Sequence, residues 1–173
     1  IDTLSIADAT PVYAAINAAK NFEVLGLTAA GATTVDAGQL TSLKAFSLDA
    51  DAAQTISNMA TGSTVAVTTA HATNITLSSA TGIHDLGLTI GVAGKAGVAV
   101  KGSITVGQNN IALSSLGDGV TGNTIKTLVN ADNSVITVTG NNNLTITEAL
   151  AGTAIGSKVD ASALTGKLSP SKG

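Results

Sequence analysis

The chain contains no cysteine, no tryptophan and no arginine. Without cysteine it can form neither a disulfide framework nor a thiolate metal site. Without arginine it lacks the bidentate fork that usually recognises phosphates and carboxylates, which disfavours enzymes of phosphorylated substrates. The 8 lysines and 11 acidic residues give a net charge of -3, spread along the chain without a basic cluster. The chain therefore lacks the cluster of positive charge that is typical of nucleic-acid-binding proteins.

Aromatic and charged residues are also scarce, at 2% and 11% of the chain. A charged fraction of roughly 25% is usual for soluble domains, so the surface must be rich in hydroxyl and amide groups. No apolar run approaches the roughly 18 residues of a spanning helix. The chain begins at Ile1 without methionine, and we expect it to be one β-repeat domain, residues 1–173, excerpted from a longer surface protein.

Short segments with alternating apolar residues recur along the chain and predict strands. The first four are centred on residues 4–6, 25–27, 46–48 and 65–67, in steps of 21, 21 and 19 residues. Later segments follow mostly at steps of roughly 10 residues, at 75–77, 86–88, 98–100, 104–106, 111–113, 136–138 and 144–146. Between them lie Gly, Asn, Asp and Ser, which tolerate the left-handed conformations of tight corners.

Periods of about 20 residues are typical of stacked architectures. We therefore predict an all-β right-handed parallel β-helix, or solenoid, with one strand per coil at first and two per coil later. A β-sandwich is the alternative fold, although sandwiches usually have Trp or Tyr anchors and this chain has a single tyrosine, Tyr13.

One segment departs from the strand pattern. Thr10 is a possible helix cap, Pro11 suits a first helical turn, and Val12, Ile16 and Ala19 would share one face. This predicts one short helix near residues 11–20. A further helical turn could form at 148–157, where Gly152 and Gly156 weaken the prediction.

The sequence VDAGQLTSL at 35–43 returns as VDASALTGKL at 159–168. We interpret each copy as a strand end followed by an aspartate that accepts hydrogen bonds from nearby backbone amides. A metal-ligand role for these aspartates is the less favoured alternative.

Four segments in order resemble proteobacterial S-layer proteins and related large surface proteins: TISNMATGSTVAVT at 55–68, ITLSSATG at 75–82, VITVTGNNNLTIT at 135–147 and KVDASALTGKL at 158–168. The resemblance implies type I secretion, an extracellular location in the surface layer, and self-assembly into a lattice held by calcium. It also implies that an anchor to lipopolysaccharide, if present, lies in another domain.

The glycine-rich calcium repeats that such proteins carry are not found in this chain. The oxygen-rich turns that could bind calcium instead contain Asp49, Asp51, Asp118, Asn123 and Asp132. Each is better explained as a corner that satisfies its own backbone. Calcium is therefore expected mainly outside this segment or at interfaces.

We expect no enzymatic activity. Only His71 and His84 could act as bases in a hydrolytic triad, and Asp49 with Asp51 is the only close carboxylate pair for a glycosidase. The glycine-rich stretch at 91–102 lacks the Lys-Ser/Thr spacing of a phosphate loop. The favoured function is a structural S-layer segment whose partners are copies of itself, and the alternative is an adhesin or passenger-type solenoid that binds a host or glycan ligand.

Overall fold

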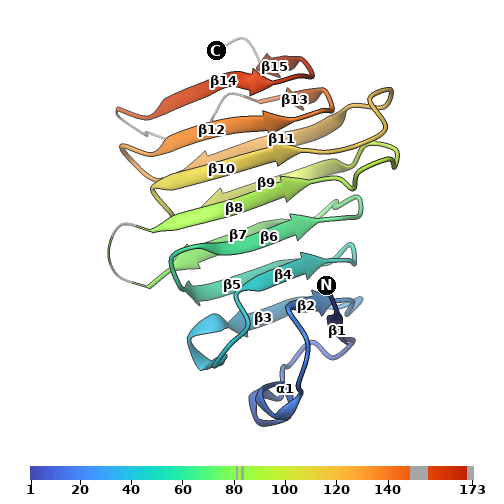
Figure 1. Cartoon of the computed structure of the whole chain (residues 1–173), viewed down its shortest axis with the longest axis vertical. Helices are drawn as coiled ribbons and strands as arrows, with labels where there is room; N and C mark the ends of the chain where they lie inside the picture. Colours follow the sequence, from blue (N-terminus) through green and yellow to red (C-terminus); the bar gives the residue numbers. More distant parts are fainter. Residues whose placement is uncertain (81, 83, 149–155, 171–173) are drawn as a thin grey trace.

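The computed structural model of the chain describes residues 1–80, 82, 84–148 and 156–170, which form a parallel β-solenoid with one short α-helix, α1 (Tyr13–Ala18), and one 3₁₀ turn, η1 (Ala37–Gln39). The strands are stacked in two sheets that face each other, one in front of the other in Figure 1. No helix among the described residues is long and apolar enough to cross a membrane.

Sheet A has eight strands and sheet B has seven. The strands of sheet A are β1 (Thr3–Ile6), β2 (Val24–Leu27), β4 (Ala45–Leu48), β6 (Ser63–Val67), β8 (Asp85–Ile90), β10 (Asn110–Ser115), β12 (Val135–Gly140) and β14 (Lys158–Leu164). The strands of sheet B are β3 (Thr33–Asp36), β5 (Gln54–Met59), β7 (Ile75–Ser79), β9 (Ala99–Val106), β11 (Asn123–Asn130), β13 (Leu144–Ile146) and β15 (Leu168–Pro170).

The chain alternates between the two sheets and rises by one strand layer per coil, with a right-handed winding (Figure 1). All of the strand pairs are parallel, which confirms the solenoid and excludes the antiparallel sandwich. In sheet A, Leu4 pairs with Leu25, which pairs with Phe46, which pairs with Val65. The steps of 21, 21 and 19 residues are therefore the lengths of the first coils.

The interior between the sheets is a column of small aliphatic side chains. Alternate residues of each strand point inward and are buried. Val65 stacks on Leu88, then Leu113, then Val138 in sheet A, each at most 1% exposed. A core two sheets thick and stacked in register needs side chains of similar size, which explains why Ala, Val, Leu and Ile replace aromatic residues.

Every coil after the first contains two strands, so the prediction of one strand per coil at the start was wrong. Alternation missed β3, β5 and β11 because their buried positions are not all apolar. Thr33 and Gln54 are buried beside Val35 and Ile56 in β3 and β5. In β11 the register shifts between Ile125 and Thr127, which breaks the two-residue period.

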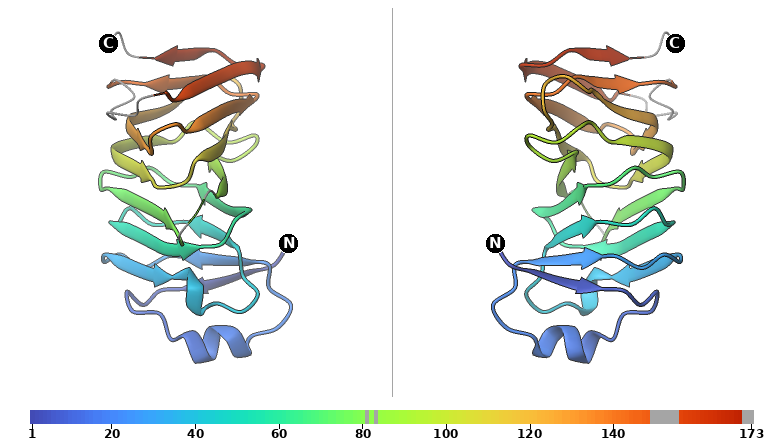
Figure 2. Two further views of the ribbon diagram at one scale, coloured as in Figure 1. Left: turned by 90° about the vertical axis from the view of Figure 1, so that its left-hand side faces the viewer. Right: turned by 90° about the vertical axis from the view of Figure 1, so that its right-hand side faces the viewer.

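Helix α1 lies across the N-terminal end of the solenoid, below β2 and β3 in Figure 2. The predicted helix is confirmed, but its predicted cap is not. The N-cap of the helix is Val12, which makes no side-chain capping bond, so Thr10 is not the cap. Val12 is also 62% exposed, so it does not belong to the buried face of the helix. Ile16 is the helix residue that enters the core.

Side chains of α1 form hydrogen bonds with residues 36–41, at the end of β3 and in the turn that follows it. The Asp36 N–H donates to Tyr13 Oη at 2.6 Å, Asn17 Nδ2 donates to the Gln39 carbonyl at 2.9 Å, and Asn17 Oδ1 accepts from the Thr41 N–H at 3.1 Å. The helix thus closes the N-terminal end of the core. The possible helical turn at 148–157 falls mostly outside the described residues.

The repeated VDA segments both form the predicted aspartate turns. Asp36 Oδ1 accepts from the Gly38 N–H at 3.0 Å, and Asp160 Oδ1 accepts from the Ser162 N–H at 2.9 Å. The first copy lies in sheet B and the second in sheet A. The repeat therefore marks a common turn chemistry rather than equivalent coil positions.

The turn after β12 requires glycine for two reasons. Gly140 has φ +112°, and a Cβ there would lie 2.0 Å from the Ser115 carbonyl oxygen of the preceding coil. We predict that Gly140→Ala lowers the free energy of unfolding by about 3 kcal/mol or more. The control Gly119→Ala, at φ +75° with open space around it, should cost about 1–2 kcal/mol in denaturant titrations. Equal losses in the two variants would contradict the close-approach argument.

Candidate functional site

Candidate functional residues and surfaces lie in three regions of the solenoid: the corners that hold the predicted calcium residues, the outer face of sheet A, and the C-terminal end of the core. Most of the residues singled out from the sequence lie at the corners.

Asp49 and Asp51 follow β4 and bind different parts of the next coil. Asp49 is half-buried, and its Oδ1 accepts from the hydroxyls of Ser47 and Thr68, each at 2.5 Å. Asp51 is exposed, and its Oδ1 accepts from the Ala72 N–H at 2.7 Å. Both carboxylates thus tie one coil to the next, whereas the sequence suggested that they satisfy the backbone of their own corner.

Asp118 forms the turn between β10 and β11. Its Oδ1 accepts from the N–H groups of Thr121 and Val120, both at 2.8 Å. These two hydrogen bonds hold the pKa of the Asp118 carboxyl below its ordinary value because they stabilise the ionised form. Asp132 is an exposed turn residue between β11 and β12.

Asn123 is completely buried at the start of β11. Its amide oxygen accepts from the Val98 N–H at 2.7 Å, and its amide nitrogen lies 2.9 Å from the carbonyl oxygens of Ile90 and Leu116. One side chain therefore satisfies the backbone of three neighbouring segments where the chain turns between sheets. The Asn123 amide therefore lies inside the corner, whereas Asp118 is exposed to solvent.

We predict that Asn123→Ala lowers the free energy of unfolding by about 3–5 kcal/mol, because it leaves several buried backbone groups without partners. Asn110→Ala is the matched control. Asn110 is exposed, and its side-chain amide donates to Asp85 Oδ1 at 2.7 Å on the surface, so the loss should stay within about 1 kcal/mol. Chemical denaturation of both variants tests this, and similar losses would contradict the structural role of Asn123.

His71 lies in the core with 0% exposure. Its Nδ1 is 2.9 Å from the Thr69 carbonyl oxygen, and its Nε2 is 3.1 Å from Gln54 Oε1. The ring lies between two coils, enclosed from solvent, and both of its nitrogens face oxygen atoms. Asp85, next to His84, accepts from Asn110 on the outer face of sheet A.

As at Asp118, hydrogen bonds lower the pKa of other turn carboxylates. Hydrogen bonds from Asn58 and Gln39 hold the pKa of Asp36 below its ordinary value, and the hydrogen bond from Thr127, with the nearby Lys126 ammonium, does the same for Glu148. The Lys126–Glu148 ion pair measures 3.5 Å and is exposed. Turns of several coils therefore depend on ionised carboxylates.

We predict that the fold loses stability in acid. A carboxyl whose folded-state pKa lies below its unfolded value stabilises the fold above the unfolded pKa, and this contribution disappears as pH falls through the folded pKa. The free energy of unfolding should therefore be level from pH 7 to about pH 5 and fall below about pH 4. Asp118→Asn should flatten this slope in urea titrations at each pH. An identical slope in the variant would argue against the role of Asp118.

The outer face of sheet A carries small and hydroxyl-bearing side chains. One column runs through Thr64, Gly87, Ala112 and Thr137 in adjacent strands. Two hollows lie on this face, of about 360 Å³ beside Gly87 and Ala112 and about 260 Å³ beside Ala45 and Ala66. Apart from Asp85 in the first hollow, the residues that line both hollows are uncharged.

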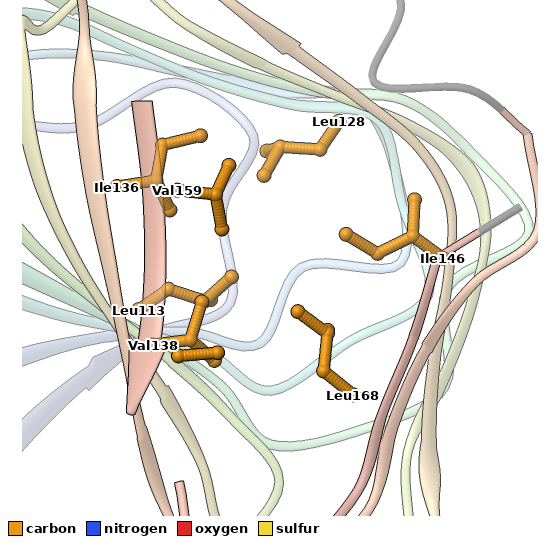
Figure 3. A pocket seen from close by; sticks show the side chains of 8 residues that line it. Leu113, Leu128, Ile136, Val138, Ile146, Val159 and Leu168 are labelled. Carbon is orange, nitrogen blue, oxygen red and sulfur yellow. The ribbon is translucent and has the colours of Figure 1, made fainter. Parts of the chain in front are cut away.

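At the C-terminal end the core opens into an apolar cavity of about 330 Å³ (Figure 3). Side chains from the two sheets point toward each other across it. The lining residues are Leu113, Leu128, Ile136, Val138, Ile146, Val159, Ala161 and Leu168. Sequence analysis missed this site because every lining residue looks like an ordinary core residue.

No protein-family profile, curated protein or solved structure matches the chain. The fold and the side-chain geometry are therefore the basis for any functional interpretation.

Within the described ranges, no group of three or more His, Cys, Asp or Glu side chains comes together as a metal site would require. Asp49, Asp51 and Asp118 are engaged in turns, and Asn123 is engaged in a buried corner. Calcium binding stays a prediction, and the residues best placed for it are the exposed carboxylates at the corners, where a neighbouring molecule could supply further oxygen ligands.

Proposed function

We propose that the chain is a structural segment of a self-assembling bacterial surface-layer protein, located outside the cell, with copies of itself as partners. The observation that carries this proposal is the outer face of sheet A: a surface made mainly of Thr, Ser, Ala and Gly, with Asp85, Lys158 and Asp160 as charged residues, that runs along a regular rod.

Such a face suits lateral packing. Parallel sheets are usually covered on both sides, whereas the outer side of sheet A is bare in the single chain. Small side chains let a second flat surface approach closely, and threonine and serine hydroxyls can pair across the contact without burying a charge. Repetition along the rod multiplies weak contacts, as a two-dimensional lattice requires.

The placement of the candidate catalytic residues supports a non-enzymatic role. His71 is enclosed in the core, and Asp49 and Asp51 accept hydrogen bonds from Thr68 and Ala72 of the next coil. In the proposed lattice, calcium binds at contacts between molecules, and attachment to lipopolysaccharide belongs to another domain.

A second candidate is an adhesin that binds a glycan or host protein. The hollow of about 360 Å³ on sheet A favours it, because Asp85 and Asn110 offer polar groups at its edge. A site of this kind would recognise one soluble ligand without forming an array.

The lattice proposal predicts that charge on sheet A prevents assembly. Protein carrying this chain should form ordered sheets on lipid in calcium, seen by electron microscopy, and lose them with a calcium chelator. Thr64→Lys with Thr137→Lys, both exposed on sheet A, should abolish the sheets because buried lysines repel and lose water. Thr34→Lys with Thr147→Lys, both exposed on the sheet B side, should leave them intact.

Absence of ordered arrays in the unmodified protein would refute the proposal. Saturable binding of one soluble glycan, abolished by the Thr64/Thr137 substitutions without any array, would establish the adhesin instead.

A further inference from the structure

A hollow of about 520 Å³ lies on the outer face of sheet B, the sheet that lies behind sheet A in Figure 1. Its volume is within the range of sites for small molecules. Strands β9 and β11 each pair with a strand on both sides, so the hollow lies within the stack of coils. The lining residues are Ala99, Val100, Lys101, Thr124, Lys126, Thr147 and Glu148.

A β-bulge in β9 brings two lysines of the hollow together. In the register of β9 with β11, Lys101 and Gly102 lie opposite a single residue, Lys126. An extra residue in one strand bends that strand and changes the direction of its side chains. Gly102 permits the bulge, because a Cβ there would lie 2.0 Å from the Thr73 carbonyl oxygen of the preceding coil. Lys101 and Lys126 therefore meet at the bulge, and both are exposed.

Small and hydroxyl-bearing residues form the rest of the hollow. Ala99 pairs with Thr124 across β9 and β11, and both are half-buried. Thr147, on the next coil, is exposed, and its hydroxyl donates to the Lys126 carbonyl at 3.4 Å. A hydroxyl oxygen also accepts hydrogen bonds, so Thr124 and Thr147 can bond to the hydroxyls of a ligand.

The charged groups in the hollow are two ammonium groups and one carboxylate, which give a net charge of +1. Lys126 Nζ lies 3.5 Å from Glu148 Oε1, and Thr127 Oγ1 donates to Glu148 Oε2 at 2.6 Å. These contacts fix the position of the Glu148 carboxylate. Lys101, in contrast, forms no ion pair with another of the described residues. The hollow therefore holds one cation without a counter-charge, although the whole chain has a net charge of -3.

This arrangement of charge suits a ligand that has one anionic group and several hydroxyls. Lysine is a compact point charge that attracts carboxylate or phosphate without requiring a bidentate geometry. The oxygens of Glu148 keep lone pairs that can accept hydrogen bonds from ligand hydroxyls. A simple anion would leave Glu148 without a role, and a neutral sugar would leave Lys101 without one. A sugar with an acidic group engages both.

We infer that the hollow on sheet B binds a sugar unit that carries one acidic group. The acidic group lies against the ammonium groups of Lys101 and Lys126, and the ring hydroxyls bond to Glu148 and Thr147. This site differs from the hollow considered for an adhesin, which lies on sheet A and has Asp85 as its charged residue. The inference does not rest on the proposed lattice, because packing through sheet A leaves the outer face of sheet B accessible.

The test is a titration of isotope-labelled protein with sodium glucuronate, followed by the NMR chemical shifts of the backbone amides. Glucuronate should bind saturably with a Kd of about 1 mM, since its charged contacts are exposed to water. The shifts should be centred on the bulge of β9 and its neighbours in β11. Glucose, which lacks the anion, and acetate, which lacks the hydroxyls, should bind about tenfold more weakly. Glucose 6-phosphate at the same amides also supports the inference, and the tighter of the two acidic sugars identifies the preferred acidic group.

Lys101→Gln removes the unpaired cation and should weaken glucuronate binding about tenfold, and Lys126→Gln should weaken it as well. Lys95→Gln is the matched control, because Lys95 is an exposed lysine in the loop between β8 and β9 and does not line the hollow. It makes the same change in net charge and should leave the Kd unchanged. Glu148→Gln removes a repulsion and weakens an acceptor, so acetate should bind more tightly and the preference for glucuronate over acetate should fall. Circular dichroism checks that each variant is folded.

Several outcomes would overturn the inference. Absence of saturable binding by either acidic sugar would do so, as would equal binding of acetate and glucuronate, which indicates an adventitious ion only. Binding that is unchanged in Lys101→Gln but lost in the Thr64/Thr137 lysine variant would place the sugar on sheet A instead. Ordered arrays without sugar binding at the bulge would remove only this inference, whereas sugar binding at the bulge without arrays would remove only the lattice proposal.

Discussion

The in-register parallel hydrogen-bond ladder is the constraint on which the rest of the structure depends. Each coil must return to the same position one strand layer further on, so the inward residues stack in columns and the corners must turn tightly. Some polar residues of the interior form hydrogen bonds that join one segment of the chain to another. Asn123 joins three segments, and His71 joins Thr69 to Gln54.

The sequence predicted the fold class because the two-residue alternation is clear in sheet A, where inward positions such as Leu25, Phe46 and Val65 are apolar. It found β7, β9 and β13 of sheet B but missed β3, β5 and β11, where Gln54 and Thr33 occupy inward positions and Thr127 interrupts the period. Tertiary hydrogen bonds and a register shift, which no local pattern records, decide those strands. The helix was found from its composition, but not its cap, because packing of Ile16 and the bond to Tyr13 fix it instead.

The corner carboxylates were found in the sequence because an aspartate between two strand segments is a local turn signal. The other surfaces were not, since they exist only after coils are superposed. Thr64, Gly87, Ala112 and Thr137 are far apart in the chain and become one column. Likewise, Val159 resembles any strand valine until its place at the end of the stack is known.

The coil is also a unit of length. One complete coil adds a single strand layer, about 4.8 Å, to the rod. Duplication or loss of a whole coil would therefore lengthen or shorten the molecule in fixed increments while both sheet faces keep their orientation, whereas loss of one strand residue would turn inward side chains outward. Recombination between the gene segments that encode two coils can therefore change the distance between the two ends of the rod while the composition of both sheet faces stays the same.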